Sequence, residues 1–401
     1  MRVAIVVPGL TTPGGVPTVA RLLGAALNQR GRYHTTFISI ATSSRDSSSV
    51  RLLSPRSWGR PLRVVAGRSE EGDFLHVGAL LAELEPLRYR PRKVLTDLLD
   101  SFDVVQVVAG IPAWALVATA SSRPVFLYVA SVASLERKRR LQQEVFPWRR
   151  WMTMVTSALE RSALREVARV FVMNRSMRDV VASVVPPSRV VLAPPGIDTE
   201  RFVPTAYNPN GPLLWIARLA DPRKNLSLML HSYKRVKQGL PAAPRLIICG
   251  SGLPRREDGE LAKRLGIDTS LQIRSNVPPA ELPSLYQQAS VFVMSSDEEG
   301  FGLVALEAMA SGLPVVSTRC WGTEMTVRHG ENGLLTPVGD ASALADAITW
   351  LLERPALRAQ MGRRGRELAT QMFALGVAAQ PFFHAYDELV ATSSGDRDVI
   401  T

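Results

Sequence analysis

Two glutamates, Glu299 and Glu307, flank a glycine-bearing turn within the segment VFVMSSDEEGFGLVALEAMASGLPVVST at 291–318. The letters VFVMSS predict a buried strand, LVALEAMA predicts a helix that ends near the following glycine and proline, and PVVST predicts a second strand. One carboxylate can accept hydrogen bonds from sugar hydroxyls and the other from a ribose. The spacing therefore indicates a nucleotide-sugar site. The alternative left open is that Glu299 only complements the helix dipole and Glu307 lies on a solvated helix face.

The turn itself is suited to an anion. The N–H groups of Phe301, Gly302 and Leu303 are expected in the first turn of the helix, where amides lack intrahelical partners and the helix dipole is positive. Gly300 and Gly302 carry no side chain, so a bulky ligand can approach the backbone. A phosphate group fits both properties.

Basic residues stand at the start of another predicted helix. LLWIARL reads as a strand that contains Arg218, ADPR as a loop, and NLSLMLHSYKRV as a helix with Asn225 at its N-cap. Arg223 and Lys224 then lie at the positive end of that helix, which is unfavourable by a few tenths of a kcal/mol each, roughly, unless an anion intervenes. A diphosphate is such an anion, whereas the alternative is loop charges that simply reach water.

These segments resemble glycosyltransferase family 4, the retaining GT-B enzymes that use nucleotide sugars. EEGFGLVALEAMASGLPVV resembles the family's motif of two glutamates separated by seven residues, and WIARLADPRKNLSLML, LIICGSGLP and GTEMTVRHGENGLLTPVGDASALADAI continue the likeness over roughly residues 211–350. The resemblance implies an α/β protein of the GT-B fold, with two Rossmann-like, doubly wound domains facing a central cleft.

The resemblance also implies roles for individual residues. Arg218 and Lys224 would bind the donor diphosphate, Glu299 would orient the sugar hydroxyls, and these three would carry catalysis. Glu307 would hold the ribose. The remaining donor-binding residues by resemblance are Gly15, Gly250, Val277, Gly300, Phe301, Gly302 and Leu303. For Gly15, which follows the first strand in PGLTTPGG, a glycine needed only for a tight turn is the open alternative.

One departure from the family concerns the acceptor side. Members commonly carry a histidine after a central strand of the first domain, but FLYVASVASLERK contains none, so we expect Ser131 or Ser134 in that space. The aspartate, any residue, aspartate signature of a metal site is also absent. The anion site already has basic side chains, so we expect no cofactor and no obligatory metal.

The order of predicted elements gives the domains. Strands and amphipathic helices alternate in both halves, which favours parallel, doubly wound sheets. We expect an N-terminal acceptor-binding domain at 1–195, a C-terminal donor-binding domain at 211–371, and a helix at about 372–392 that packs back on the first domain. Residues 41–70, rich in Ser and Arg, predict a long surface loop or a local insertion.

Charge and composition suggest partners and location. The chain has 401 residues and a net charge of +12, and residues 1–200 hold 27 Lys or Arg against 16 Asp or Glu. An anionic or lipid-linked acceptor, or an anionic membrane surface, suits that first half. The stretch ERKRRLQQEVFPWRRWMTM joins cations to interfacial aromatics, and an ordinary helix pair with aromatics in the core is the open alternative. No nucleic-acid recognition motif is present.

The first residues read as a strand and not as a secretory signal, and two cysteines give no disulfide framework, so we expect a cytoplasmic protein at the inner face of the cell membrane. The function expected is transfer of a sugar from a nucleotide-diphosphate sugar to an acceptor with retention of configuration. The chief alternative is a catalytically silent GT-B-like scaffold that binds nucleotide sugar at a membrane assembly. A sugar phosphorylase or an epimerase is a third.

Overall fold

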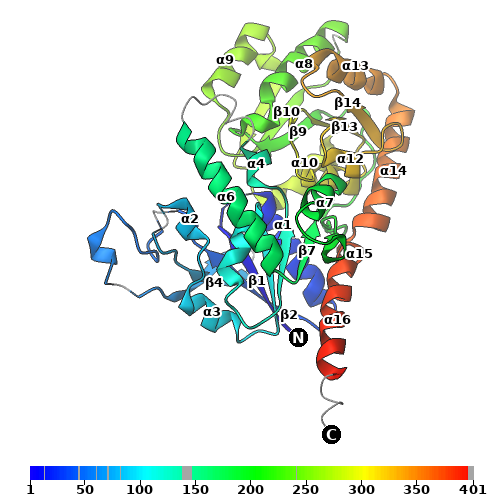
Figure 1. Ribbon diagram of the computed structural model, residues 1–401. Helices are drawn as coiled ribbons and strands as arrows, with labels where there is room; N and C mark the ends of the chain where they lie inside the picture. The colour runs from blue at the N-terminus through cyan, green and yellow to red at the C-terminus, as the bar shows by residue number, and fades with distance from the viewer. Residues whose placement is uncertain are drawn as a thin grey trace. The chain divides into compact units, whose positions relative to one another are not determined.

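The structure is a computed structural model that describes residues 1–12, 14–43, 46–59, 61–69, 72–81, 83–137, 147–240 and 242–395. The chain forms two compact units (Figure 1). The first contains Met1–Pro194 together with Ala379–Thr401, and the second contains Pro195–Ala378. Each unit has one sheet whose strands alternate with helices, as predicted for a doubly wound α/β fold.

The first unit is built on an eight-stranded sheet of order β3-β4-β2-β1-β5-β6-β7-β8. All neighbouring strands run parallel except β3 and β4. The central strands, such as VVQVVA, are buried along their whole length, as expected for a parallel sheet covered on both faces. The strands are β1 (Arg2–Pro8), β2 (His34–Ile40), β3 (Val64–Ser69), β4 (Gly72–Val77), β5 (Val104–Ala109), β6 (Val125–Val129), β7 (Arg169–Val172) and β8 (Val190–Leu192).

Helices cover this sheet and include one from the far end of the chain. In that last helix, α16, the Phe383 ring stacks on Tyr33 with centroids 5.6 Å apart, and the Tyr386 hydroxyl donates to Gln106 Oε1 at 2.8 Å. The helices are α1 (Gly15–Gln29), α2 (Glu85–Arg88), α3 (Lys93–Leu99), α4 (Ala133–Glu136), α6 (Pro147–Glu166), α7 (Arg175–Ala182) and α16 (Gln380–Gly395), with 3-10 turns at η1 (Pro55–Ser57), η2 (Pro112–Ala118) and η3 (Pro187–Arg189).

The second unit is built on a six-stranded, fully parallel sheet of order β11-β10-β9-β12-β13-β14. The helices α8 (Leu226–Gly239), α13 (Ala341–Leu352) and α14 (Pro355–Phe373) lie around its strands (Figure 1). The strands are β9 (Leu213–Arg218), β10 (Leu246–Ser251), β11 (Leu271–Ser275), β12 (Val291–Met294), β13 (Val315–Thr318) and β14 (Gly333–Thr336).

Between these strands lie the helices and turns that carry the candidate site. They are η4 (Pro222–Lys224), α8 (Leu226–Gly239), α9 (Arg256–Leu265), η5 (Asp268–Ser270), η6 (Pro279–Glu281), α10 (Leu282–Gln288), α11 (Leu303–Ala310), α12 (Thr323–Thr326), α13 (Ala341–Leu352), α14 (Pro355–Phe373) and α15 (Leu375–Ala378).

Two expectations about local structure are wrong in part. The segment 41–70 is not all loop, because β3 pairs antiparallel with β4 and extends the sheet. Its residues VVAGRS expose most of their side chains at the sheet edge, so the strand lacks the apolar alternation that reveals one. The helix expected at about 372–392 is divided, since α14 ends at Phe373 and α16 begins at Gln380.

Among the described residues, no helix has both the length and the apolar character needed to cross a bilayer.

Candidate active site

The order of strands in the second unit marks where a ligand is expected. From β9 the chain moves outward through β10 to β11, and it then returns to place β12 on the other side of β9. In open α/β sheets, ligands bind at the carboxyl ends of the strands where the order reverses in this way. Here that point lies between β9 and β12. Arg218 ends β9, and Glu299 follows β12 in the next loop.

A lysine and a glutamate meet at this point. Lys224 Nζ donates to Glu299 Oε1 at 2.6 Å, and the Ser296 hydroxyl donates to the same oxygen at 2.7 Å. The two side chains are only 17% and 9% exposed. The structure therefore brings together two of the three predicted catalytic residues. An ammonium has three donor protons, so the ion pair does not exhaust the hydrogen-bonding capacity of Lys224.

Backbone and side-chain bonds hold the two loops in register. The Asn225 side chain accepts from Leu228 N at 3.1 Å, which confirms the predicted N-cap, and it donates to Asp297 Oδ1 at 2.9 Å. Ser295 Oγ donates to the carbonyl oxygens of Lys224 and Asn225, each at 3.0 Å. The positively charged end of α8 is thus tied directly to the loop that carries Glu299, and a ligand would find this geometry already formed.

Arg218 has a partner that sequence reasoning missed. Its guanidinium pairs with Asp221, which also accepts from Arg223 Nη2 at 2.9 Å. Burial alone would raise the pKa of Asp221, but the hydrogen bonds and charge of Arg223, with the charge of Arg218, lower it to about 2. Asp221 also caps η4 by accepting from Arg223 N. The signal in the sequence was an aspartate before Pro-Arg-Lys, which is typical of an N-cap.

Glu307 lies on α11 and faces a tyrosine, not open water. Its Oε2 accepts from the Tyr286 hydroxyl at 2.7 Å. Burial raises the pKa of Glu307 to about 7, while the Tyr286 hydrogen bond and the Arg201 charge act in the opposite direction. Glu307 is thus partly buried and bonded to Tyr286, which a residue on a fully solvated helix face would not be. The role of Glu307 toward a ribose stays a prediction.

The glycine turn differs in detail from the expectation. The helix α11 begins at Leu303, after Gly302 at φ 84°, so Phe301 and Gly302 precede the first helical turn. The Phe301 side chain is 3% exposed and its ring centroid lies 5.8 Å from that of Phe373. Phe301 therefore anchors the turn that follows Glu299 and Gly300, because its ring is packed into the unit while its backbone stays at the helix entry.

The other predicted donor-binding residues are Gly250, Val277 and Gly15, and their local surroundings differ. Gly250 has φ +146°, and a Cβ there would lie 1.7 Å from the carbonyl oxygen of Ala217, so packing of β10 on β9 already requires glycine. Val277 follows β11 and is partly buried. Gly15, in the first unit, begins α1, and a Cβ would meet nothing within 4 Å, so crowding does not impose glycine there. Their contacts with a donor stay predictions.

In the first unit, Ser131 follows β6 and Ser134 is an exposed residue of α4. The Ser131 hydroxyl donates to the carbonyl oxygen of Val132 at 3.5 Å. Behind this loop, Glu160 of α6 is 4% exposed and accepts from Ala133 N at 2.8 Å. Whether either serine replaces the absent histidine stays a prediction.

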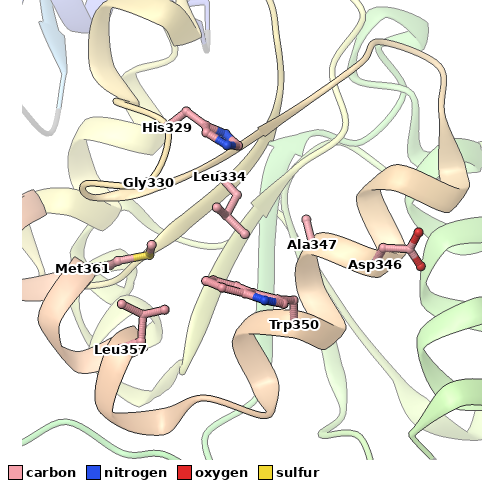
Figure 2. Close-up of a pocket in the computed structure, with 8 residues that line it drawn as sticks. All are labelled: His329, Gly330, Leu334, Asp346, Ala347, Trp350, Leu357 and Met361. Carbon is pink, nitrogen blue, oxygen red and sulfur yellow. The ribbon is translucent and has the colours of Figure 1, made fainter.

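A separate pocket in the second unit has a different character. It has a volume of about 480 Å³, and Figure 2 shows its mainly apolar lining, from β14, α13 and α14. Figure 2 also shows Leu334 and the Trp350 ring beside one another, with Met361 and Leu357 to one side. None of the predicted site residues lines it. Its apolar walls do not suit a diphosphate.

Comparison with known families covers most of the chain. A family model described as "Glycosyltransferase Family 4" matches residues 13–201, and one described as "Glycosyl transferases group 1" matches residues 197–368. The meeting point of the two matches falls close to the end of the first unit's long segment at Pro194.

The curated relatives that the chain matches are also named as glycosyltransferases. The chain is 36% identical over 187 residues to a D-inositol 3-phosphate glycosyltransferase of Corynebacterium urealyticum, covering 41% of this chain and 43% of that protein. It is 31% identical over 232 residues to a GDP-mannose-dependent alpha-(1-6)-phosphatidylinositol monomannoside mannosyltransferase of Mycolicibacterium smegmatis, covering 52% and 60%. The chain thus spans about half the length of the curated relatives that it matches.

Solved structures agree on the fold. Anabaena HepE in complex with UDP and glucose matches with a TM-score of 0.72 at 16% identity, over 97% of this chain and 100% of that chain. A sucrose-phosphate synthase from Thermosynechococcus elongatus matches with a TM-score of 0.70 at 21% identity, over 97% and 99%. At such identities the likeness shows the fold alone, and that fold is GT-B.

Proposed function

Since the chain belongs to glycosyltransferase family 4, we propose that it transfers a sugar from a nucleotide-diphosphate sugar to an acceptor and retains the anomeric configuration. The observation that carries the proposal is the Lys224–Glu299 ion pair at the point where the strand order reverses. A cation and a carboxylate fixed side by side suit a substrate that separates charge as its glycosidic bond breaks.

The proposed catalysis is electrostatic. As the bond breaks, negative charge develops on the departing diphosphate, where Lys224, Arg218 and the amides at the start of α11 stabilise it. Glu299 stabilises the cationic character of the sugar ring and orients its hydroxyls. Because Asn225 and Ser295 already hold the two loops together, little reorganisation accompanies the reaction.

The first experiment asks whether a donor binds and reacts. Melting temperature is measured with UDP-, GDP- and ADP-sugars, since a ligand that binds only the native state raises it. Product analysis on the donor that binds then gives transfer and anomeric configuration. Lys224→Ala is expected to reduce transfer at least about a hundredfold. Lys93→Ala, which removes an exposed lysine from its ion pair with Asp97, is the matched control and should be neutral. Donor binding without any transfer would favour the silent scaffold.

We also propose that transfer needs no divalent metal, because Lys224 and Arg218 supply positive charge where the diphosphate is expected. Activity should therefore survive treatment with EDTA. A loss that Mg²⁺ or Mn²⁺ restores would contradict this.

The proposed acceptor is anionic or lipid-linked, in line with the names of the D-inositol 3-phosphate glycosyltransferase and the phosphatidylinositol monomannoside mannosyltransferase that the chain resembles. We further propose that α6 meets an anionic membrane, at the cytoplasmic face expected from the sequence. Residues 138–146 of the predicted basic stretch lie outside the described residues. On α6, Trp148, Trp151 and Met154 are 64%, 51% and 69% exposed, and the two indole rings stack 4.9 Å apart.

Charge on the same helix supports that proposal. Besides these apolar residues, the exposed residues of α6 include the four arginines Arg149, Arg150, Arg161 and Arg165. Exposed indoles beside arginines suit the headgroup region of an anionic bilayer. Co-sedimentation with phosphatidylglycerol vesicles, against phosphatidylcholine vesicles, tests this. The double variant Trp148→Ser/Trp151→Ser should lose binding, whereas Trp58→Ser, at a tryptophan 59% exposed elsewhere in the first unit, should keep it.

A further inference from the structure

Trp321 is an exposed tryptophan fixed beside the turn that carries Glu299. Its side chain is 47% exposed, while its neighbour Cys320 is 5% exposed. Gly322 N donates to the carbonyl oxygen of Glu299 at 3.2 Å, and a Cβ on Gly322 would lie 2.5 Å from Phe301 N. The backbone that bears the indole therefore lies directly against the glycine turn, and only glycine fits next to Trp321.

This segment is firmly held. Cys320 N donates to Thr323 Oγ1 at 2.9 Å, Thr323 Oγ1 donates to Thr318 O at 2.9 Å, and Cys320 Sγ donates to Ser296 O at 3.1 Å. Its polar groups are bonded among themselves and to the loop of Ser296. Because Cys320 and Thr323 are buried and bonded, the indole is presented to solvent from a fixed base. Single exposed tryptophans are common on protein surfaces, and it is the place of Trp321 beside the Glu299 turn that points to a ligand.

The order of the strands indicates which part of a bound donor would lie near Trp321. The carboxyl end of β10 carries Gly250 and that of β11 leads to Val277, two of the predicted donor-binding residues, and we place the base of the donor beside them. The ends of β9 and β12 lead to Lys224 and Glu299, where the diphosphate is expected. A nucleotide sugar has the same linear order of parts. Its sugar then falls toward the end of β13, and Trp321 lies three residues beyond that strand.

We propose that Trp321 is the platform on which the donor sugar ring packs, and that it thereby helps to set which sugar is accepted. This rests on the proposed function. One face of a pyranose presents C–H groups that pack on an indole, while Glu299 is placed to take the hydroxyls. The negative face of the indole also attracts the positive charge that the ring acquires in the transition state. An epimer with an axial hydroxyl on the packed face loses part of this contact, so the indole discriminates between sugars.

The test separates the sugar from the rest of the donor. Affinities of Trp321→Ala and Trp321→Phe are measured by calorimetry for UDP, GDP and ADP, and for UDP-glucose, UDP-galactose, GDP-mannose and ADP-glucose. For the nucleotide that binds the wild-type chain, Trp321→Ala should weaken the nucleotide sugar about tenfold and leave the bare nucleoside diphosphate unchanged. Trp321→Phe should recover part of the loss, and the ratio of kcat/KM between epimeric donors should change in Trp321→Ala.

The outcomes distinguish failure of the proposed function from failure of the proposal about Trp321. If the wild-type chain binds neither nucleotides nor nucleotide sugars, the proposed function fails. If it binds them and Trp321→Ala weakens both equally, or neither, the inference about Trp321 is overturned while the proposed function stands. Trp58→Ala, at an exposed tryptophan of the first unit, is the matched control and should change nothing. Because Trp321 is half exposed, the variants should fold, which circular dichroism checks.

Discussion

Replacing Glu299 with glutamine should separate donor binding from catalysis, with effects of opposite sign. Lys224 Nζ lies 2.6 Å from Glu299 Oε1. A diphosphate oxygen that accepts a second proton from the same ammonium then lies within about 5 Å of the carboxylate, given usual hydrogen-bond lengths. Two unit negative charges at about 5 Å repel each other by about 3 kcal/mol at an effective dielectric constant of about 20. Glu299 therefore opposes binding of the diphosphate that it helps to cleave from the sugar.

The magnitude expected for Glu299→Gln follows from that repulsion. Solvent and salt reduce the effect to about 1–2 kcal/mol, which is about five- to thirtyfold tighter binding of the bare nucleoside diphosphate. Transfer should fall by about a hundredfold or more, because the amide cannot stabilise a cationic sugar ring. Lys224→Ala should weaken the nucleotide and slow transfer together.

Isothermal titration with the nucleoside diphosphate at low and high salt is the assay. The gain from Glu299→Gln should shrink as salt rises, since it is electrostatic. Glu260→Gln, which removes a half-exposed carboxylate paired with Arg256, is the matched control and should leave the affinity unchanged. If Glu299→Gln leaves the affinity for the nucleoside diphosphate unchanged or weakens it, the expected repulsion is absent, and the placement of the diphosphate at Lys224 is refuted.

Two further predictions concern stability. Burial raises the pKa of Glu160 to about 7. The Glu136 charge also raises this pKa, while the hydrogen bond from Ala133 N lowers it. In the unfolded chain the carboxyl has its ordinary pKa of 4.5, whereas the folded chain keeps it protonated up to about pH 7. The wild-type chain should therefore lose stability as the pH rises from 4.5 to 7, and Glu160→Gln should melt higher than wild type at pH 8 but not at pH 4. The Arg366 guanidinium donates to the carbonyl oxygens of Phe202, Ala310 and Thr199, at 2.7, 2.8 and 3.0 Å. Arg366→Ala leaves these oxygens without their donor, so it should lower the melting temperature by several degrees, more than Arg363→Ala on the same helix. Equal melting temperatures of the two variants would contradict this prediction.

Local features of the site could be predicted where the residue type alone determines them. Asn225 caps α8 because its side chain can accept from an exposed helix amide, a property visible in the sequence. The alternation of apolar runs likewise predicts β9 and β12. The Tyr286–Glu307 bond could not be found this way, because it joins α10 to α11 and depends on how those helices pack. The edge strand β3 was missed for a related reason, since only its pairing with β4 makes it a strand.

The meeting of Lys224 with Glu299 depends on a feature that no local pattern contains. The alternation of strands and helices is equally compatible with β12 following β11 at the outer edge of the sheet. Neighbouring strands lie about 4.8 Å apart, so that order would separate β9 from β12 by three spacings, about 14 Å. Side chains from the two loops would then not form an ion pair. Because β12 instead pairs with β9, the cation and the carboxylate come within 2.6 Å. The candidate chemistry thus follows from the reversal of strand order, and any variant that loosens the β9–β12 pairing should lose nucleotide binding before it loses the fold.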